Sequence, residues 1–266
     1  MKRKKYLVIG NPINHSLSPK LQSYWLKENN INATYDKMKL DSKEIKNLID
    51  DIRRQIIAGC NVTVPFKKEV IPFLDELSLE AELTQSVNTI IYKNNNLVGH
   101  NTDIAGFDKA IKSLSINMKG KKIFVLGSGG VVPSIIYALK KMNVSEITVS
   151  NRTRQKAEEL NESFKNIKII DWGEMIDFDV VINATSLGLN NEFINLDFSK
   201  TGKNKLFYDV IYNPTETNFL KEGRRLGNKV ENGKLMFIYQ ALESFKLWHG
   251  IEPQIDTNIF KILNND

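Results

Sequence analysis

The chain has 266 residues, of which 41% are hydrophobic and 26% are charged, and its formal net charge is +6. This length suggests about two domains, and the composition is that of a folded globular protein rather than a disordered one. The basic residues are spread along the chain except in the run Lys2–Lys5, which argues against a nucleic-acid-binding module. A mild positive bias also suits an anionic small-molecule substrate and cofactor.

Cysteine and histidine usage excludes several kinds of site. Cys60 is the single cysteine, so no disulfide can form within the chain and a reducing compartment is indicated. The three histidines are scattered without metal-ligand spacing, so no metal site is expected.

The apolar run Tyr6–Ile9 is too short for a signal peptide, and no segment approaches the length of a membrane span. We therefore expect a cytoplasmic protein that binds neither membrane nor nucleic acid.

The first half of the chain alternates short strands and helices. Apolar periodicity and turn residues predict strands at 5–10, 33–39, 59–66, 87–92 and 97–100, and helices at 19–29, 41–56, 67–74 and 78–84. Ser16 and Ser18 follow the first strand, where Ser18 suits the N-cap of the next helix. The two hydroxyls could equally hold an anion at this strand-to-helix turn.

Two charged residues stand directly after predicted strands. In the stretch 61–68, Asn-Val-Thr-Val-Pro-Phe-Lys-Lys, Pro65 ends the strand because proline has no N–H for the ladder. Lys67 follows at the edge where open α/β sheets bind ligands. It either exchanges a proton in a reaction or is a solvated charge, as most surface lysines are. Asp103 either contributes to the same site or caps the helix that begins near Ile104, and one residue can do both.

The second half reads as a doubly wound parallel sheet. Strands are predicted at 122–127, 146–150, 167–170, 178–183, 205–211 and 229–231. Helices are predicted from the turn 128–133 to about 142, and at 153–165, 233–249 and 256–263. We expect a substrate-binding catalytic domain of 1–103 plus 239–266 and a Rossmann-like NADP-binding domain of 104–238. The active site is expected in the cleft between the two α/β domains.

A glycine turn between an apolar strand and a helix matches most of a dinucleotide-binding fingerprint. It comprises Gly127, Ser128, Gly129, Gly130 and Val131, and Val132 takes the place of the third glycine. An NAD site wants an acidic residue after the next strand, to bond the ribose hydroxyls. Arg152 stands there instead, which suits a 2′-phosphate, so we predict NADP. The alternative is that Arg152 is a solvated loop charge.

The order of short motifs along the chain resembles the shikimate dehydrogenase family. These motifs are Ser-x-Ser-Pro, Asn-Val-Thr-Val-Pro-Phe-Lys, Val-Asn-Thr, Asn-Thr-Asp-x-x-Gly, Gly-x-Gly-Gly, Asn-Arg-Thr, Asn-Ala-Thr-Ser-x-Gly and a late Tyr-Gln. They span the chain from Gly10 to Gly250. The resemblance implies reversible, NADPH-dependent reduction of 3-dehydroshikimate to shikimate, in the shikimate pathway of chorismate and aromatic amino acid biosynthesis.

The same resemblance implies roles for individual residues. Lys67 would be the proton donor and acceptor, and Asp103 would pair with it. The substrate would be bound by Ser16, Ser18, Thr63, Lys67, Asn88, Asp103, Tyr212 and Gln240. The cofactor would contact Gly127, Ser128, Gly129, Gly130, Val131, Asn151, Arg152, Thr153, Thr185, Val210 and Gly233.

The chain departs from the family in its glycine turn and leaves some alternatives open. The family usually has small residues where Val131 and Val132 stand, and a basic or small one at Pro133, so we expect the turn to approach the pyrophosphate less closely. A mixed quinate/shikimate dehydrogenase is the nearest alternative function. A non-catalytic NADP-binding sensor is a more distant one. The oligomeric state is not encoded in any motif, and a homodimer is one option.

Overall fold

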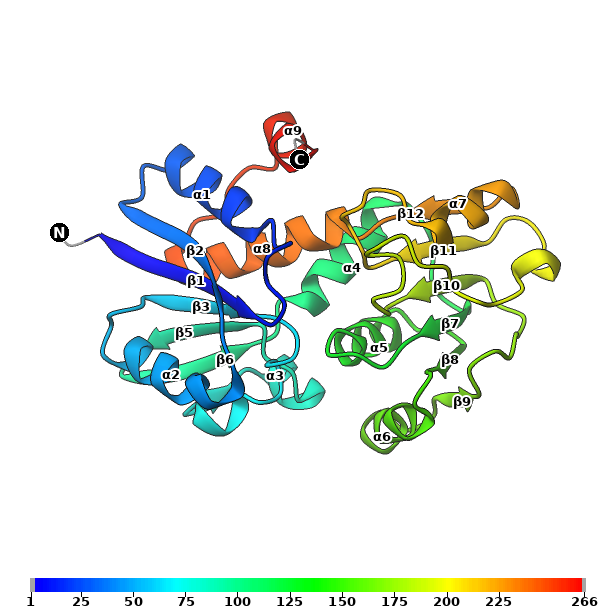
Figure 1. Ribbon diagram of the computed structural model, residues 1–266, viewed down its shortest axis with the longest axis horizontal. Coiled ribbons are helices and arrows are strands. Elements are labelled where there is room, and N and C mark those ends of the chain that lie inside the picture. Colours follow the sequence, from blue (N-terminus) through cyan, green and yellow to red (C-terminus); the bar gives the residue numbers. More distant parts are fainter. Residues whose placement is uncertain (1–2, 265–266) are drawn as a thin grey trace. The chain divides into compact units, whose positions relative to one another are not determined.

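The computed structural model describes residues 3–264, which form two α/β units (Figure 1). One unit runs to Gly106 and resumes at Ile238, and the other comprises Phe107–Phe237. The chain passes from one unit to the other within two helices, α4 (Asp103–Ser113) and α8 (Lys234–His249). The expected domain limits, 103/104 and 238/239, fall in these same helices.

The first unit contains a mixed sheet with the strand order β2-β1-β3-β5-β6-β4. Its strands are β1 (Lys4–Gly10), β2 (Ala33–Lys39), β3 (Gly59–Val62), β4 (Glu76–Leu77), β5 (Thr89–Lys93) and β6 (Asn96–His100). Its own helices are α1 (Ser18–Glu28), α2 (Ile45–Arg53), α3 (Leu79–Thr84) and α9 (Thr257–Asn264), with 3-10 turns at Ser42–Glu44 and Ile71–Phe73. Apolar residues of β1, α2 and β3 form its core.

The directions of the strands in this sheet place several polar residues at the same edge. β1 and β3 are parallel, β5 is antiparallel to β3, and β6 is antiparallel to β5. The carboxyl ends of β1, β3 and β6 therefore lie at the same edge as the amino end of β5. Thr63 and Lys67 follow β3, Asn88 precedes β5, and Asp103 follows β6.

The second unit contains a fully parallel sheet in the order β12-β11-β10-β7-β8-β9. Its strands are β7 (Lys122–Leu126), β8 (Glu146–Ser150), β9 (Lys168–Ile170), β10 (Val180–Asn183), β11 (Leu206–Asp209) and β12 (Lys229–Glu231). Its own helices are α5 (Val132–Lys141), α6 (Arg154–Phe164) and α7 (Asn218–Arg225), with a 3-10 turn at Phe198–Lys200. This confirms the predicted doubly wound sheet. The strand order reverses at β7, and ligands of such sheets bind outside the carboxyl ends at that point.

The structure corrects two elements of the expected pattern. The predicted helix 67–74 was wrong, because the carbonyl of Lys67 accepts from Val87 N at 2.9 Å and is not free for a helical bond. Turns lead instead to the short strand β4. Helix α7 was not predicted, yet parallel strands β11 and β12 require a crossover. Its Gly223 lies so close to the sheet that a Cβ there would meet Phe207 Cγ at 2.6 Å.

Within residues 3–264, no helix has the length and apolar character needed to cross a bilayer. Lys2, part of the basic run noted in the sequence, lies outside the described residues.

Gly59 in the first unit lies in close contact with the side chain of Trp248. The indole of Trp248, whose Nε1 donates to Ile90 O at 3.1 Å, occupies the space where a side chain at Gly59 would lie. A Cβ added at Gly59 would be 2.4 Å from Trp248 Nε1. We expect Gly59→Ala to lower the free energy of unfolding by about 1–3 kcal/mol, because the indole must shift. Urea denaturation measures this change.

Gly129→Ala is the control for this measurement. The atom nearest to its added Cβ would be 3.9 Å away, so stability should change by less than ~0.5 kcal/mol. Equal stability of the two variants would contradict the packing argument.

Candidate active site

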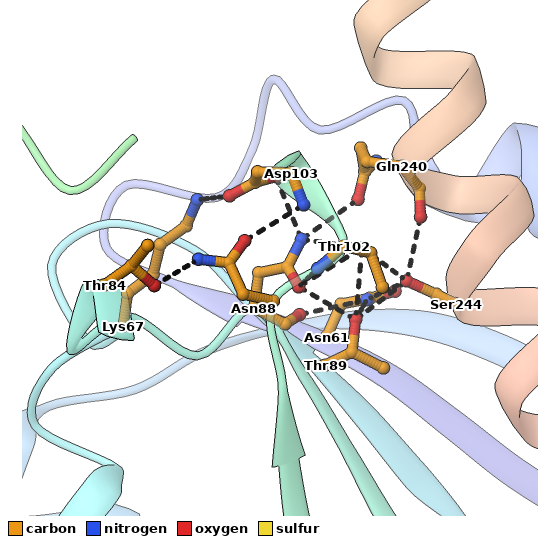
Figure 2. Close-up of polar contacts among 10 residues, drawn as sticks. Asn61, Lys67, Thr84, Asn88, Thr89, Thr102, Asp103, Gln240 and Ser244 are labelled. Atoms are coloured by element: carbon orange, nitrogen blue, oxygen red, sulfur yellow. Dashed lines mark hydrogen bonds and ion pairs between the residues drawn. The ribbon is translucent and has the colours of Figure 1, made fainter. Parts of the chain in front are cut away.

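A buried ion pair joins the two residues that the sequence singled out after β3 and β6. Lys67 Nζ donates to Asp103 Oδ2 at 2.5 Å (Figure 2). The two side chains are only 9% and 8% exposed. Lys67 is therefore not a solvated charge, whereas its neighbour Lys68 is exposed. A buried pair of this kind persists only where further hydrogen bonds compensate for the loss of water.

Asn88 supplies one of these further bonds and links the pair to α8. Its Nδ2 donates to Asp103 Oδ1 at 2.9 Å and faces Gln240 Oε1 at 3.5 Å (Figure 2). Both carboxylate oxygens of Asp103 are thus engaged, and α4 begins at Asp103 itself. The alternative that Asp103 serves as the N-cap of α4 is therefore wrong. The structure brings together Lys67, Asn88, Asp103 and Gln240, four of the predicted substrate-site residues.

The remaining predicted substrate residues of this unit lie beside neighbouring strands. Ser16 is in the turn after β1, and its Oγ accepts from Ser18 N at 3.3 Å. Ser18 is buried and is the first residue of α1, because Leu17 is the N-cap, so the predicted capping role of Ser18 was wrong. Thr63 N donates to Ile9 O at 2.9 Å, which ties Thr63 to the end of β1. Substrate binding by these hydroxyls stays a prediction.

Tyr212 lies in the second unit, in the segment after β11. Its ring stacks on Phe237, with centroids 4.4 Å apart and an interplanar angle of 23°. The ring is therefore held by packing, while its predicted contact with substrate stays a prediction.

The glycine turn follows β7 at the point where the strand order reverses. Gly127 has φ +106°, and a Cβ there would lie 2.8 Å from Ala184 O, so this position needs glycine. Val132, which replaces the fingerprint's third glycine, is fully buried at the start of α5. Its side chain packs inside the unit and leaves the exposed side of the turn to Gly129. Pro133 occupies the first turn of α5, where its missing N–H costs nothing.

Two arginines follow β8, and they differ in whether they have partners within the protein. Arg154 is engaged by Glu158 Oε1 at 2.8 Å and by Asp171 Oδ1 at 2.6 Å. Arg152 is exposed and makes neither an ion pair nor a hydrogen bond within residues 3–264. Its guanidinium is thus available for a phosphate, in line with the prediction of an NADP site. Asn151 Nδ2 donates to the carbonyl of Thr153 at 2.7 Å, which shapes the loop.

Asn183 organises the other predicted cofactor residues at the carboxyl ends of β10 and β11. Its Oδ1 accepts from Thr185 N at 3.1 Å and from Thr185 Oγ1 at 2.7 Å, and its carbonyl accepts from Val210 N at 3.0 Å. Gly233 packs here as well, since a Cβ on it would lie 2.1 Å from Val210 O. Thr185, Val210 and Gly233 therefore lie at one edge of the sheet.

Asp209 is a buried acid beside this edge that the sequence analysis did not identify. Its carboxylate accepts from Thr217 Oγ1 at 2.6 Å, from Ile211 N at 3.0 Å and from Asn183 Nδ2 at 3.1 Å. Burial raises the pKa of Asp209 to about 6, although these hydrogen bonds lower it in part. The available signal was a polar residue that ends an otherwise apolar strand. The same signal marks Asn183 at the end of β10.

Models of known families match most of the chain. The shikimate dehydrogenase substrate binding domain matches residues 8–90, the shikimate/quinate 5-dehydrogenase domain matches residues 108–210, and the shikimate 5′-dehydrogenase C-terminal domain matches residues 235–257. The chain belongs to the shikimate dehydrogenase family. The resemblance stated from the motifs is thereby confirmed.

Individual relatives of this family agree over their full lengths. The NADP⁺-dependent shikimate dehydrogenase of Pelagibacter ubique is 56% identical over 263 residues, covering 98% of this chain and 99% of the relative. The crystal structure of the Aquifex aeolicus shikimate dehydrogenase superposes with a TM-score of 0.90 at 34% identity and covers 99% of this chain and 98% of its own. The Thermus thermophilus enzyme, in complex with NADP(H) and shikimate, has a TM-score of 0.89 at 29% identity, with 98% of each chain covered.

The raised pKa of Asp209 predicts a pH-dependent stability. The folded state keeps a proton on Asp209 up to about pH 6, whereas the unfolded chain releases it near pH ~3.9. Between these values the folded state binds more protons, so the free energy of unfolding falls as pH rises. Asp209→Asn removes this loss. We expect the variant to gain up to ~3 kcal/mol relative to wild type between pH 4 and pH 7.

Urea denaturation at a series of pH values checks this prediction. Asn can still accept from Ile211 N and donate toward Thr217, so the local bonds are largely retained. Asp177→Asn is the control, because Asp177 is 69% exposed and paired with surface lysines. Its difference from wild type should stay small across the range. A constant difference between Asp209→Asn and wild type would contradict the assignment.

Proposed function

We propose that this member of the family is an NADP-dependent shikimate dehydrogenase, which reduces 3-dehydroshikimate to shikimate and catalyses the reverse oxidation. The reaction would serve the shikimate pathway, which leads to chorismate and the aromatic amino acids. The observation that carries the proposal is the buried Lys67–Asp103 pair, bonded through Asn88 toward Gln240. Family membership supplies the substrate class.

The chemistry requires a hydride and a proton for the substrate's ketone. When bound, NADPH supplies the hydride. Lys67 Nζ gives its proton to the developing alkoxide and stabilises the negative charge there. Asp103 Oδ2 keeps Nζ in one position. In the oxidation direction the same nitrogen takes up the hydroxyl proton.

Substrate orientation is proposed to rest on the polar groups at the edge of the first sheet. Ser16 and Ser18, in the segment after β1, would hold the carboxylate, together with Tyr212. Thr63, Asn88 and Gln240 would bind the ring hydroxyls. Support comes from the strand directions, which place Thr63, Lys67 and Asn88 at one edge.

The cofactor groups fit NADP in chemistry as well as in fold. The turn at Gly127 leaves no room for a side chain, as a pyrophosphate-binding turn requires. The unpaired guanidinium of Arg152 suits the 2′-phosphate. Gly127 to Val131 would hold the pyrophosphate, Asn151, Arg152 and Thr153 the adenosine phosphate, and Thr185, Val210 and Gly233 the nicotinamide side.

One assay separates this function from its alternatives. Formation of NADPH or NADH is followed by absorbance with shikimate or quinate as substrate, each with NADP⁺ and NAD⁺. We expect turnover with shikimate and NADP⁺. Comparable rates with quinate would establish the mixed enzyme, since quinate is the second substrate that the family description names. Absence of turnover with every pair would overturn the proposal in favour of a non-catalytic sensor.

The proton-transfer role predicts a specific kinetic defect. We expect Lys67→Ala to lower kcat by at least ~10²-fold with little change in the shikimate KM, because the positioned acid is lost. Steady-state kinetics on the folded variant measures it. Lys68→Ala is the matched control, since Lys68 is adjacent but exposed, and its kcat should stay near that of wild type. Near-normal kcat for Lys67→Ala would disprove the proton donor.

The cofactor preference predicts a defect confined to one cofactor. We expect Arg152→Ala to raise the KM for NADPH by ~10-fold or more, because a charge-assisted hydrogen bond to the 2′-phosphate is lost. Activity with NADH, which lacks this phosphate, should change little and serves as the internal control. A native enzyme that prefers NADH would contradict the role of Arg152.

Two further properties stay predictions. The thiol of Cys60 is fully buried and burial raises its pKa, which fits a structural role in a reducing cytoplasm. Subcellular fractionation would test that location. Sedimentation velocity would test whether the protein is a homodimer, the option left open by the sequence.

A further inference from the structure

Three buried hydroxyl groups lie beside the amide of Asn88. They belong to Thr89 in β5, Thr102 in the segment before α4, and Ser244 in α8, and we call them the hydroxyl cluster (Figure 2). Their exposed fractions are 0%, 4% and 0%. None of the three is among the groups proposed to bind substrate, so we expect any role to be exerted through the side chains that they bond.

The hydroxyl cluster is internally bonded and reaches the amide oxygen of Asn88. Thr89 Oγ1 lies 2.8 Å from Ser244 Oγ, and Thr102 Oγ1 lies 3.2 Å from it. Thr89 Oγ1 lies 3.1 Å from Asn88 Oδ1 and Thr102 Oγ1 lies 3.2 Å from it, while Asn88 Nδ2 donates to Thr102 Oγ1 at 2.9 Å. The backbone N–H of Thr102 donates to the same oxygen at 2.8 Å.

A second amide fixes the direction of hydrogen bonding in the cluster. Tyr35 Oη donates to Asn61 Oδ1 at 2.5 Å, which turns Asn61 Nδ2 toward Thr89 Oγ1 and Ser244 Oγ, each at 3.0 Å. Ser244 Oγ in turn donates to the carbonyl of Gln240 at 3.0 Å. Because each hydroxyl has one hydrogen, the two threonine hydrogens are left for Ser244 Oγ and Asn88 Oδ1.

This arrangement determines which way the amide of Asn88 faces. The two orientations of an amide have nearly the same shape, so its hydrogen bonds decide between them. With Oδ1 accepting from Thr102 N and near the hydroxyl of Thr89, Nδ2 donates to Asp103 Oδ1 and Thr102 Oγ1 and faces Gln240 Oε1. In the opposite orientation, the amide oxygen would face the carboxylate of Asp103 and repel it. The carboxylate that holds Lys67 would then lose a donor.

We propose that the hydroxyl cluster positions the active site, by orienting Asn88 toward Asp103 and by bonding α8, the helix that carries Gln240, to the same point through Ser244. The inference rests on the proposed dehydrogenase function. Thr89, Thr102 and Ser244 are positioning residues, since they act through Asn88 and Gln240. We expect loss of these hydroxyls to lower kcat/KM for shikimate. The cofactor-binding groups in the second unit should be unaffected.

A matched pair of variants at Thr89 tests this proposal. Thr89→Val keeps the shape of the side chain and removes the hydroxyl, while Thr89→Ser keeps the hydroxyl and removes the methyl. We expect Thr89→Val to lower kcat/KM for shikimate by ~5-fold or more, because the hydrogen-bonded cluster around the amide of Asn88 loses one of its hydroxyls. Thr89→Ser should restore most of the activity. NADP⁺ affinity, measured by calorimetry, should be the same in both variants.

Ser244→Ala supplies an independent variant in case Thr89→Val does not fold. It should also lower kcat/KM for shikimate and leave NADP⁺ affinity unchanged. The assay is run at a temperature at which a thermal melt shows that the variant is folded. Thr148→Val, which removes a buried hydroxyl in β8 of the other unit, is the control and should retain wild-type kcat/KM for shikimate.

The double variant Thr89→Val/Ser244→Ala decides whether the two hydroxyls act as one unit. Residues that act through one partner give non-additive losses, so the double variant should lose about as much as the worse single variant. Multiplied losses, equal losses for Thr89→Val and Thr89→Ser, or wild-type kinetics in both hydroxyl deletions would overturn the positioning role. A wild-type protein that does not oxidise shikimate would instead overturn the proposed function.

Discussion

The polar architecture of the first unit depends on the burial of one charge pair, Lys67 and Asp103. Removing two charges from water costs more than their attraction returns, unless further hydrogen bonds occupy the remaining donor and acceptor sites. Asp103 accepts a hydrogen bond from Asn88, and the amide of Asn88 is in turn bonded by the hydroxyl cluster. In a low-dielectric interior, a network with unpaired polar groups would be less stable than an interior without polar groups. The network therefore extends from the ion pair to α8, where Ser244 bonds the Gln240 carbonyl.

Strand direction is what makes this network possible. In a fully parallel sheet, residues that precede a strand lie at the edge opposite those that follow its neighbour. The antiparallel strand β5 places Asn88, which precedes it, at the edge where Lys67 and Asp103 follow β3 and β6. The second unit needs no such reversal. Its predicted cofactor groups all follow strands of a parallel sheet, at Gly127, Arg152 and Thr185.

The sequence predicted the parts of the site that follow from local patterns. Lys67, Asp103 and Gly127 stand at strand ends, and strand ends can be read from apolar runs followed by polar or glycine residues. The helix expected at 67–74 failed because the carbonyl of Lys67 bonds to Val87, a partner that no local window contains. The hydroxyl cluster was missed for a similar reason. Threonine is common in strands, and only tertiary packing shows that Thr89 faces Ser244.

Two buried aspartates show how differently one side chain is used in the two units. Asp103 has a cation as its partner, which the proposed chemistry requires at that point. Asp209 has only neutral donors, from Thr217, Ile211 and Asn183, and burial raises its pKa to about 6. Neutral donors offset only part of the cost of a buried charge. Asp209 therefore joins the ends of β10 and β11 to the start of α7, at the expense of stability that falls as pH rises from about 4 to about 6. Its bonding partners order the loops that carry the predicted nicotinamide-side residues.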